Sequence, residues 1–442
     1  MDDVLPRLYA EYGAYVNLSR AIPYLYDGAK PVERKILLVA YEIARDKFIK
    51  SSRIDGTTTA TYHPHSSVYG TIVNLVHFGF LDGQGNFGND LGVESSPAAA
   101  NRYTEVKLNS NFRDMFFTNI EEVPWRQFET DEMEPEYFPT MFPICLMGGS
   151  VTEGIGFGCA TKIPSFLPKD LWNRLKYLLD PNPTKKPVII KPVSDCKIIS
   201  TDGEIESLLM TGKGRIEFEG NFSKDHLQRK ISIHSWPAGM NFNTILKKFQ
   251  KELDAQDIGF VDQSCGATGT CIDFTVIKKR NMDSIYDSML NKMPSVLTSA
   301  VSFDVNLVNE FGRVFTYSID NLLMRTYAQF QKYTLKSFDS QIDKLNKQMY
   351  VNDIIIKMRP ILIRCINGGV LDPDDIIKII SDELKEPFEN IKDIFAKQSI
   401  RKLVSVNIDN TILAQKKSEI ESNIQNIDKY IFNFYIQTMK KF

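Results

Sequence analysis

Apolar residues recur at helical spacing in the first fifty positions. Leu8, Tyr12 and Tyr15 are separated by four and three residues, which predicts a helix over residues 1–19. The sequence "YDGAKP" then combines glycine and proline and is typical of a turn before a helix. The apolar run after this turn predicts a second helix over residues 32–48.

The next segments change pattern three times. Residues 51–61 are rich in serine and threonine and predict a loop. "YHPHSSVYGTIVNLVHFGF" (62–80) begins extended, because proline disfavours helix at the preceding residue, and then becomes helical. "LDGQGNFGNDLG" (81–92) predicts a glycine-rich loop. Helices separated by a loop and followed by a glycine-rich turn are typical of a helix-turn-helix or winged-helix unit.

Residues 165–325 have a different character. Short β-branched and aromatic runs such as "RIEFEGNF", "KISIHSW" and "CIDFTVIKK" predict strands. A helical pattern over residues 242–253 interrupts them. The region is therefore predicted to mix helices and sheet.

The C-terminal part carries two apolar heptad seams about seventy residues apart. They predict two long helices that pair as one antiparallel arm, with a small helical cap at the turn "NGGVLDPDD". An ordinary helical bundle is the alternative. The seam positions are Leu335, Phe338, Ile342, Leu345 and Met349, then Ile420, Ile424, Ile427, Ile431 and Phe434.

Composition narrows this picture. The 442 residues predict about two to four domains, and we expect a multidomain α+β protein with boundaries at 1–160, 161–325 and 326–442. We expect no membrane association, because no apolar run reaches the length of a spanning helix. The six cysteines form no CxxC pair and predict reduced thiols in the cytoplasm. The net charge of −2 means that any nucleic-acid surface must come from local arrangement.

One tyrosine could do chemistry. In "AANRYTEVKL", Tyr103 directly follows Arg102. A phenol with a pKa of about 10 is a poor nucleophile, but neighbouring cations favour the phenolate. The guanidinium of Arg102 is always charged and grips phosphate oxygens. On the dipeptide alone, a half-buried packing aromatic is the more common role.

Two histidines precede it in "YHPH". His63 and His65 share one face of an extended segment. Phosphate contact, metal binding and a structural role all remain open. Rolling-circle nickases pair a histidine-hydrophobic-histidine metal site with a downstream tyrosine, so a metal-dependent single-strand nickase is one alternative function. A non-catalytic dimeric DNA-binding scaffold is another.

Five segments occur in an order that belongs to a known family. They are "RAIPYLYDGAKPVERKIL", "YHPHSSVYGTIV", "LDGQGNFG", "AANRYTEVKL" and "GIGFGCATKIPSF". The chain resembles the DNA-cleaving A-type subunit of type IIA DNA topoisomerases, which includes DNA gyrase A, the topoisomerase IV ParC subunit and the medium subunit of T-even-like phage enzymes. The resemblance implies a winged-helix DNA-cleavage domain, an α/β tower domain and a coiled-coil arm that ends in a helical dimer gate.

The resemblance also implies catalytic roles. Tyr103 would join a DNA 5′ phosphate, and Arg102 would stabilise charge on that phosphate. Arg20 would contact phosphate and, in a homodimer, serve the tyrosine of the other protomer. The remaining residues implied to contact DNA are Lys30, Arg34 and Lys35 on the backbone, His63 and His65 at the cleaved strand, and Ile155 as an apolar wedge between base pairs.

Cofactors and partners follow from the same resemblance. The expected partners are double-stranded DNA, a second copy of the chain, and a B-type subunit with GHKL ATPase and Toprim domains. Mg²⁺ and ATP would be bound mainly by that subunit, and no Walker A sequence occurs in this chain. We expect a cytoplasmic protein, in the host cytoplasm if the source is viral. Because the sequence ends after the second heptad seam, we expect relaxation and decatenation without DNA wrapping.

Overall fold

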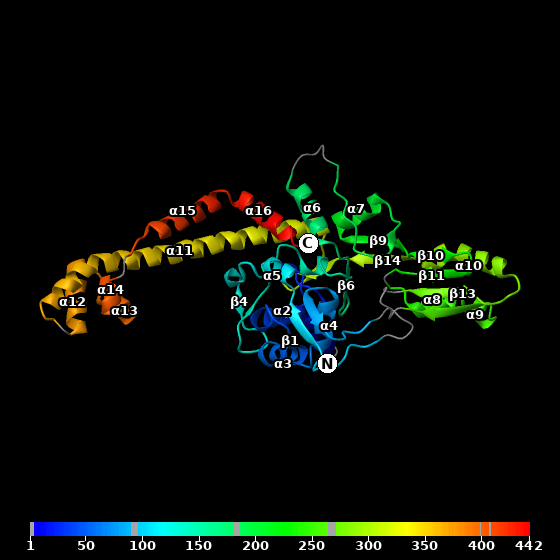
Figure 1. Cartoon of the computed structure of the whole chain (residues 1–442), viewed down its shortest axis with the longest axis horizontal. Coiled ribbons are helices and arrows are strands. Elements are labelled where there is room, and N and C mark those ends of the chain that lie inside the picture. Colours follow the sequence, from blue (N-terminus) through cyan, green and yellow to red (C-terminus); the bar gives the residue numbers. More distant parts are fainter. Residues whose placement is uncertain are drawn as a thin grey trace. The chain divides into compact units, whose positions relative to one another are not determined.

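The computed structural model describes residues 4–89, 96–180, 186–237, 239–263, 271–370, 372–397, 399–405 and 408–442. It divides into two compact units (Figure 1). The first comprises Met1–Phe330 with Phe434–Phe442, and the second comprises Gln331–Asn433. Helices and several small sheets together form a multidomain architecture, as the sequence predicts.

The first unit begins with helices. α1 spans Val4–Val16, a π-helical turn (η1) spans Asn17–Ala21, and α2 spans Pro31–Ile43. The predicted N-terminal helix is confirmed over the described residues. The second helix ends five residues earlier than predicted. The Ala44 carbonyl there accepts from the backbone of the strand that ends at Leu108, and the charged residues after it are exposed.

The serine- and threonine-rich segment is a helix, and the predicted loop over 51–61 is wrong. β1 spans Ile49–Lys50 and leads directly into α3, Ser51–Thr61. Ile54 and Thr58 are buried on one face of α3, and the Thr58 hydroxyl donates to the Ile54 carbonyl at 2.8 Å. Tertiary burial of this face therefore overrides a weak helix propensity.

A three-stranded antiparallel sheet lies against these helices. Its strand order is β1-β3-β2, with β2 at Leu81–Gln84 and β3 at Glu105–Leu108. In Figure 1, α2, α3 and α4 (Tyr69–His77) gather around β1. The predicted glycine-rich loop thus begins as a strand, and its residues 90–92 lie outside the described residues.

The chain then runs through short elements before a larger sheet. In order they are α5 Ser110–Phe117, η2 Ile120–Glu122, β4 Trp125–Arg126, β5 Glu134–Pro135, η3 Ile144–Leu146, β6 Thr152–Ile155 and β7 Ala160–Ile163. A five-stranded sheet has the order β6-β7-β14-β9-β8. The boundary predicted between residues 160 and 161 falls inside β7.

Residues 165–325 mix helices and sheet, as the sequence predicts. The elements are α6 Pro168–Leu179, β8 Lys197–Ile198, α7 Asp202–Thr211, β9 Lys213–Glu219, β10 Phe222–Asp225, β11 Lys230–Ile233, α8 Phe242–Lys248, α9 Gln250–Asp254, β12 Ile258–Asp262, β13 Ile272–Val276, α10 Met282–Leu297, β14 Thr298–Asp304, β15 Asn306–Val308 and β16 Val314–Thr316. The sheet β10-β11-β13-β12 shares an apolar core with α8 and α10. The single helix expected over 242–253 is two, α8 and α9.

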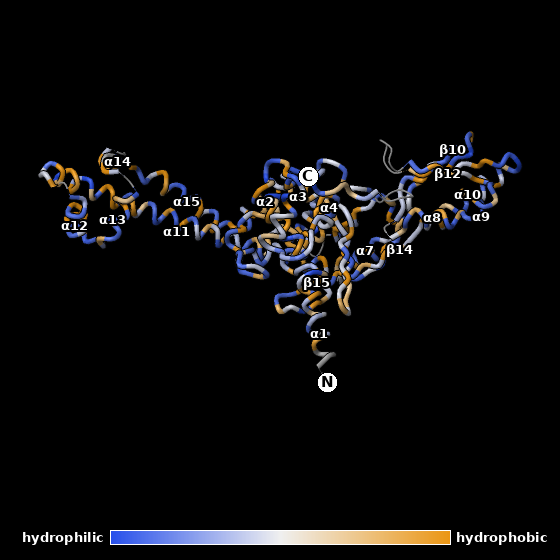
Figure 2. The backbone as a smooth tube through the Cα atoms, turned by 90° about the horizontal axis from the view of Figure 1, so that it is seen from below, coloured by the Kyte–Doolittle hydropathy of each residue, from blue (hydrophilic) through white to orange (hydrophobic). Residues whose placement is uncertain are grey.

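The second unit is helical. Its helices are α11 Ile319–Asn367, α12 Pro373–Leu384, α13 Phe388–Lys397, α14 Ile400–Ser405, α15 Thr411–Gln425 and α16 Ile427–Met439. The start of α11 and the end of α16 belong to the first unit. Figure 2 shows polar and apolar residues alternating along α11 and α15. The end of α11 shares an apolar core with α12, α13 and α14.

The long helices of this unit pair in opposite directions. Near one end, the Phe338 and Tyr430 rings lie 5.0 Å apart between centroids. Further along, Asn352 Nδ2 donates to Asn410 Oδ1 at 2.8 Å. A later residue of α11 therefore contacts an earlier residue of the C-terminal segment, so the two run antiparallel. Two facing heptad seams require this kind of side-by-side pairing. No helix in the described part of the chain is long enough and apolar enough to cross a bilayer.

A buried ion pair ties α6 to the start of α11. Arg174 is 2% exposed and binds both carboxylate oxygens of Asp320, at 2.8 and 2.7 Å. Its third contact is the Val188 carbonyl at 2.9 Å. A bidentate pair of this kind is held in one geometry by the planar guanidinium.

We expect Asp320→Asn to lower the free energy of unfolding of the first unit by about 3 kcal/mol, because it leaves the buried Arg174 charge uncompensated. Tryptophan fluorescence during urea unfolding measures this, since all three tryptophans lie in this unit. Lys191→Gln is the control, because its contact with Asp202 is 4.0 Å long and exposed, and should change stability by less than about 0.5 kcal/mol. Equal losses in the two variants would contradict the assignment.

Candidate functional site

Tyr103 lies on a tight turn just before β3. Its backbone N–H donates to the Ala100 carbonyl at 2.8 Å, while its side chain is 65% exposed. The guanidinium carbon of Arg102 lies 4.7 Å from the centre of the phenol ring. Tyr103 is therefore a projecting phenol beside a permanent cation, and not a half-buried packing residue.

Asp55 holds this turn from the side of α3. It is 5% exposed, and its carboxylate accepts hydrogen bonds from Asn101 Nδ2 at 2.9 Å and from the Ser67 hydroxyl at 2.6 Å. The Val68 backbone N–H donates to its other oxygen at 2.8 Å. One buried carboxylate thus joins α3, the segment before α4 and the Tyr103 turn. The sequence carried no signal for Asp55, because it lies in the segment assigned to a loop.

A second set of contacts fixes the other side of the turn. The Tyr69 hydroxyl donates to the Ala99 carbonyl at 2.6 Å and lies 3.0 Å from the Thr104 hydroxyl. Thr104 is fully buried, donates to the Ser51 hydroxyl at 2.8 Å and accepts from the Ser51 backbone N–H at 2.9 Å. The backbone on both sides of Tyr103 is therefore anchored, while the phenol itself faces solvent.

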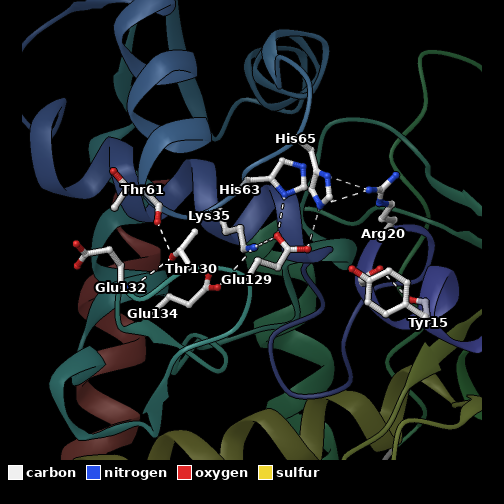
Figure 3. A network of polar contacts seen from close by, with 11 residues as sticks. Tyr15, Arg20, Lys35, Thr61, His63, His65, Glu129, Thr130, Glu132 and Glu134 are labelled. Atoms are coloured by element: carbon white, nitrogen blue, oxygen red, sulfur yellow. Dashed lines mark hydrogen bonds and ion pairs between the residues drawn. The ribbon is translucent and has the colours of Figure 1, made fainter.

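The two histidines lie beside each other around one carboxylate. Figure 3 shows the Glu129 carboxylate between both imidazoles, with Lys35 on its other side. His63 Nδ1 lies 3.1 Å from one Glu129 oxygen and His65 Nε2 lies 3.3 Å from the other. Lys35 Nζ donates to Glu129 at 2.6 Å, and Arg20 Nη2 lies 3.4 Å from both ring nitrogens of His65. The structure thus brings four predicted site residues into one cluster with Glu129, a residue that the sequence did not indicate. The four are Arg20, Lys35, His63 and His65.

The charges in this cluster fix its protonation at neutral pH. Burial raises the pKa of Glu129, but the hydrogen bond and charge of Lys35 and the hydrogen bond of His63 outweigh it and lower the pKa from 4.5 to about 2. Burial lowers the pKa of His63 below its usual value, with Lys35 and His65 adding to the effect and Glu129 opposing it. Glu129 is therefore an ionised acceptor, and His63 is a neutral imidazole.

Arg34 is not on the surface, where the resemblance placed it. Its guanidinium is bound in bidentate fashion by Asp27, at 2.6 and 3.0 Å, and the residue is 6% exposed. Asp27 is fully buried and also accepts from the Phe138 backbone N–H at 3.1 Å. We therefore assign Arg34 a structural role in this arrangement.

Lys35 is also turned inward. It is 5% exposed, and besides Glu129 it lies 3.5 Å from Glu134. Burial raises the pKa of Glu134. Lys35 thus contacts the histidine cluster through Glu129. Its acidic partners lie almost a hundred residues away in the sequence, where periodicity could not find them.

The other two predicted DNA-contacting residues lie near one hairpin. Ile155 ends β6 and is 88% exposed, which no packing role explains. Lys30 Nζ donates to the Glu153 carbonyl of the same strand at 2.6 Å. The hairpin formed by β6 and β7 therefore presents an exposed apolar side chain at Ile155 and binds a cation through the Glu153 carbonyl.

Comparison with known proteins decides the family. The family model for the A-type subunit of DNA gyrase and topoisomerase IV matches residues 20–441. The chain belongs to this family of A-type subunits. Similar curated proteins include the DNA gyrase A-type subunit of Buchnera aphidicola (subsp. Acyrthosiphon pisum), 26% identical over 87% of this chain and 47% of that protein. Its counterpart in Aminobacterium colombiense is 34% identical over 57% of this chain and 33% of that protein.

The match covers only part of those relatives. The gyrase A-type subunits of Buchnera aphidicola and Neisseria gonorrhoeae are matched over 47% and 35% of their lengths. This member of the family therefore spans about half or less of the length of the curated relatives it matches.

The histidine cluster of this family member does not suit Mg²⁺. His63, His65 and Glu129 offer three ligand atoms within 4.8 Å of one another. Mg²⁺ prefers an octahedron of oxygens, whereas this group supplies two nitrogens and one carboxylate. Lys35 and Arg20 already provide positive charge against the cluster. Within the described residues, these contacts favour a self-contained polar network over a Mg²⁺ site.

We expect Asp55→Ala to loosen the Tyr103 turn, because it leaves the Val68 N–H and the Asn101 amide without their acceptor. The free energy of unfolding should fall by about 2 kcal/mol, and amide hydrogen exchange at Tyr103 and Thr104 should accelerate. Mass-spectrometric hydrogen exchange measures this. The control is Asp46→Ala, since Asp46 is exposed and, within the described residues, its ion pair is with Arg113 at 3.2 Å. A turn that is equally protected in both variants would refute the anchoring role.

Proposed function

We propose that the chain is the DNA breakage-reunion subunit of an ATP-dependent type IIA topoisomerase. The observation that carries this proposal is Tyr103, an exposed phenol on a backbone anchored from both sides, with Arg102 over its ring. A nucleophile must reach its substrate while its backbone stays fixed. Membership of the gyrase and topoisomerase IV family of A-type subunits supports this use of the tyrosine.

The proposed reaction is a reversible transesterification. The phenol oxygen of Tyr103 attacks a DNA phosphorus, the bond from phosphorus to the 3′ oxygen breaks, and the 3′ hydroxyl leaves. The product is a 5′-phosphotyrosine ester, so one ester replaces another and the 3′ hydroxyl can reverse the step. Arg102 stabilises the charge on the phosphate oxygens, and Arg20 supplies a second exposed guanidinium.

The described architecture fits a dimeric strand-passage enzyme. We assign α2, α3, α4 and the sheet β1-β3-β2 to a winged-helix cleavage domain, and residues 161–325 to the tower. The antiparallel helices α11, α15 and α16 form the coiled-coil arm, with α12, α13 and α14 at the dimer gate. Two protomers place one Tyr103 on each strand of a duplex, and a second duplex passes through the staggered break.

Partners complete the proposed enzyme. A B-type subunit with GHKL ATPase and Toprim domains supplies ATP hydrolysis and holds Mg²⁺. The absence of a Walker A sequence and the unsuitable donor set at the histidine cluster both support this division of labour. We place the enzyme in the cytoplasm, with double-stranded DNA as its substrate.

The proposed DNA surface draws on three exposed residues and the partly buried Lys30. Arg20, Lys30, His65 and Ile155 offer cations, an imidazole and an apolar wedge. An inserted isoleucine unstacks a base step and bends the duplex, at a cost of a few kcal/mol that wider contact offsets. The buried Arg34 and Lys35 support this surface through their ion pairs with Asp27 and Glu129.

A single-strand nickase is the second candidate, favoured only by the grouping of His63, His65 and Glu129. Incubation of the purified chain with Mn²⁺ and single-stranded DNA separates the two. Nicking without a B-type subunit would favour the nickase and contradict the topoisomerase.

We expect Tyr103→Phe to abolish covalent protein–DNA complexes and strand passage, because the phenol oxygen is the nucleophile, while DNA binding persists. Reactions with the cognate B-type subunit, Mg²⁺ and ATP, stopped with detergent, measure the trapped complex. Tyr9→Phe is the matched control, since Tyr9 is 64% exposed and should leave cleavage unchanged. Strand passage that survives Tyr103→Phe would overturn the proposal.

We expect Ile155→Ala to reduce the bend of bound DNA, because the shorter side chain cannot hold a base step open. Energy transfer between dyes at the two ends of a short duplex measures the bend. Leu227→Ala is the matched control, because Leu227 is 93% exposed and has no assigned role. An unchanged bend in the Ile155 variant would contradict the wedge role.

A further inference from the structure

Glu129 constrains where the protons of both histidines lie. An ionised carboxylate only accepts hydrogen bonds, so each ring nitrogen that faces it must carry hydrogen. Those nitrogens are Nδ1 of His63 and Nε2 of His65. Lys35, which donates to the same carboxylate at 2.6 Å, keeps Glu129 ionised.

Arg20 fixes the remaining nitrogen of His65. A guanidinium has donors and no acceptor, so it requires a lone pair on the ring. Arg20 Nη2 lies 3.4 Å from both ring nitrogens of His65, and only Nδ1 can accept from it, because Nε2 donates to Glu129. His65 therefore lies between an acceptor, Glu129, and a donor, Arg20.

His63 is left in the opposite and less common form. With hydrogen on Nδ1, its neutral ring carries a lone pair on Nε2. Burial, Lys35 and His65 disfavour a second proton on His63, and Glu129 favours one. In the described part of the chain, no hydrogen bond to His63 Nε2 is found, so this nitrogen remains available.

We propose that Glu129 is a positioning residue that holds His63 in the Nδ1–H form, so that Nε2 accepts a hydrogen bond from a hydroxyl group at the cleaved strand and does not donate one to a phosphate. The identity of the strand rests on the proposed function. The hydroxyls available in that reaction are the Tyr103 phenol and the DNA 3′ hydroxyl. This arrangement favours proton handling by His63 over the phosphate contact that the sequence left open.

The first test needs neither DNA nor a partner subunit. Nitrogen-15 spectra of the full chain with labelled histidine report the tautomer of each ring, and His63→Gln and His65→Gln assign the signals among five histidines. We expect hydrogen on Nδ1 of His63 and on Nε2 of His65 near neutral pH. Hydrogen on Nε2 of His63 would overturn the proposal, and this spectrum decides even if no Glu129 variant folds.

Variants then test the cause. Glu129→Gln can donate as well as accept, so we expect the His63 signal to move toward the common Nε2–H form. Glu132→Gln is the matched control, because Glu132 is exposed in the same segment and should leave both tautomers unchanged. An unchanged His63 tautomer in a folded Glu129→Gln protein would contradict the positioning role.

The last test uses cleavage with the B-type subunit. We expect Glu129→Gln to slow cleavage by about ten- to hundredfold without weakening DNA binding. Because the carboxylate raises the pKa of His63, its loss should also move the acid limb of the pH–rate profile to lower pH. Weaker, more salt-sensitive DNA binding with an unchanged rate would show a phosphate contact instead. If wild-type protein fails to cleave at all, the proposed function fails, while the tautomer result stands.

Discussion

The Tyr103 site depends on the buried carboxylate of Asp55, which lies in a helix that the sequence does not predict. Asp55 receives hydrogen bonds from the backbone before α4, from Ser67 and from Asn101 beside the tyrosine. These donors come from two segments that are separate from α3, and burial makes each unsatisfied group costly. The same carboxylate that stabilises α3 therefore sets where Tyr103 can project. Asp55 therefore contributes both to fold stability and to the position of Tyr103.

A chain with nearly zero net charge can still bind DNA if its charges are sorted, with some cations neutralised in the interior and others left on the surface. Two cations that the family resemblance assigned to DNA, Arg34 and Lys35, are instead neutralised in the interior by Asp27 and Glu129. Their charge does not reach the surface directly. Arg34 binds Asp27 in the turn before α2, and Lys35 binds Glu129 in the histidine cluster. Exposed groups such as Arg20 are left to contact phosphate in the proposed complex. This sorting explains how a net charge of −2 is compatible with a proposed DNA-binding role.

The sequence predicts features whose signal is local. Helical spacing located α1, β-branched runs located the strands of the middle region, and the ordered motifs singled out Tyr103. It fails where distant partners decide. α3 forms because Ile54 is buried against the rest of the fold, despite a threonine-rich sequence. Glu129 lies more than sixty residues from either histidine, so only the folded chain shows that it controls their protons.

The proposed covalent link between Tyr103 and DNA can be identified chemically. Cleavage complexes formed with the wild-type chain, its B-type subunit and Mg²⁺ are digested with protease and nuclease, and mass spectrometry locates the modified peptide. We expect a nucleotide joined through its 5′ phosphate to the Tyr103 oxygen, within the peptide that contains "NRYTEVK". A link to another residue, or to a 3′ phosphate, would contradict the proposal.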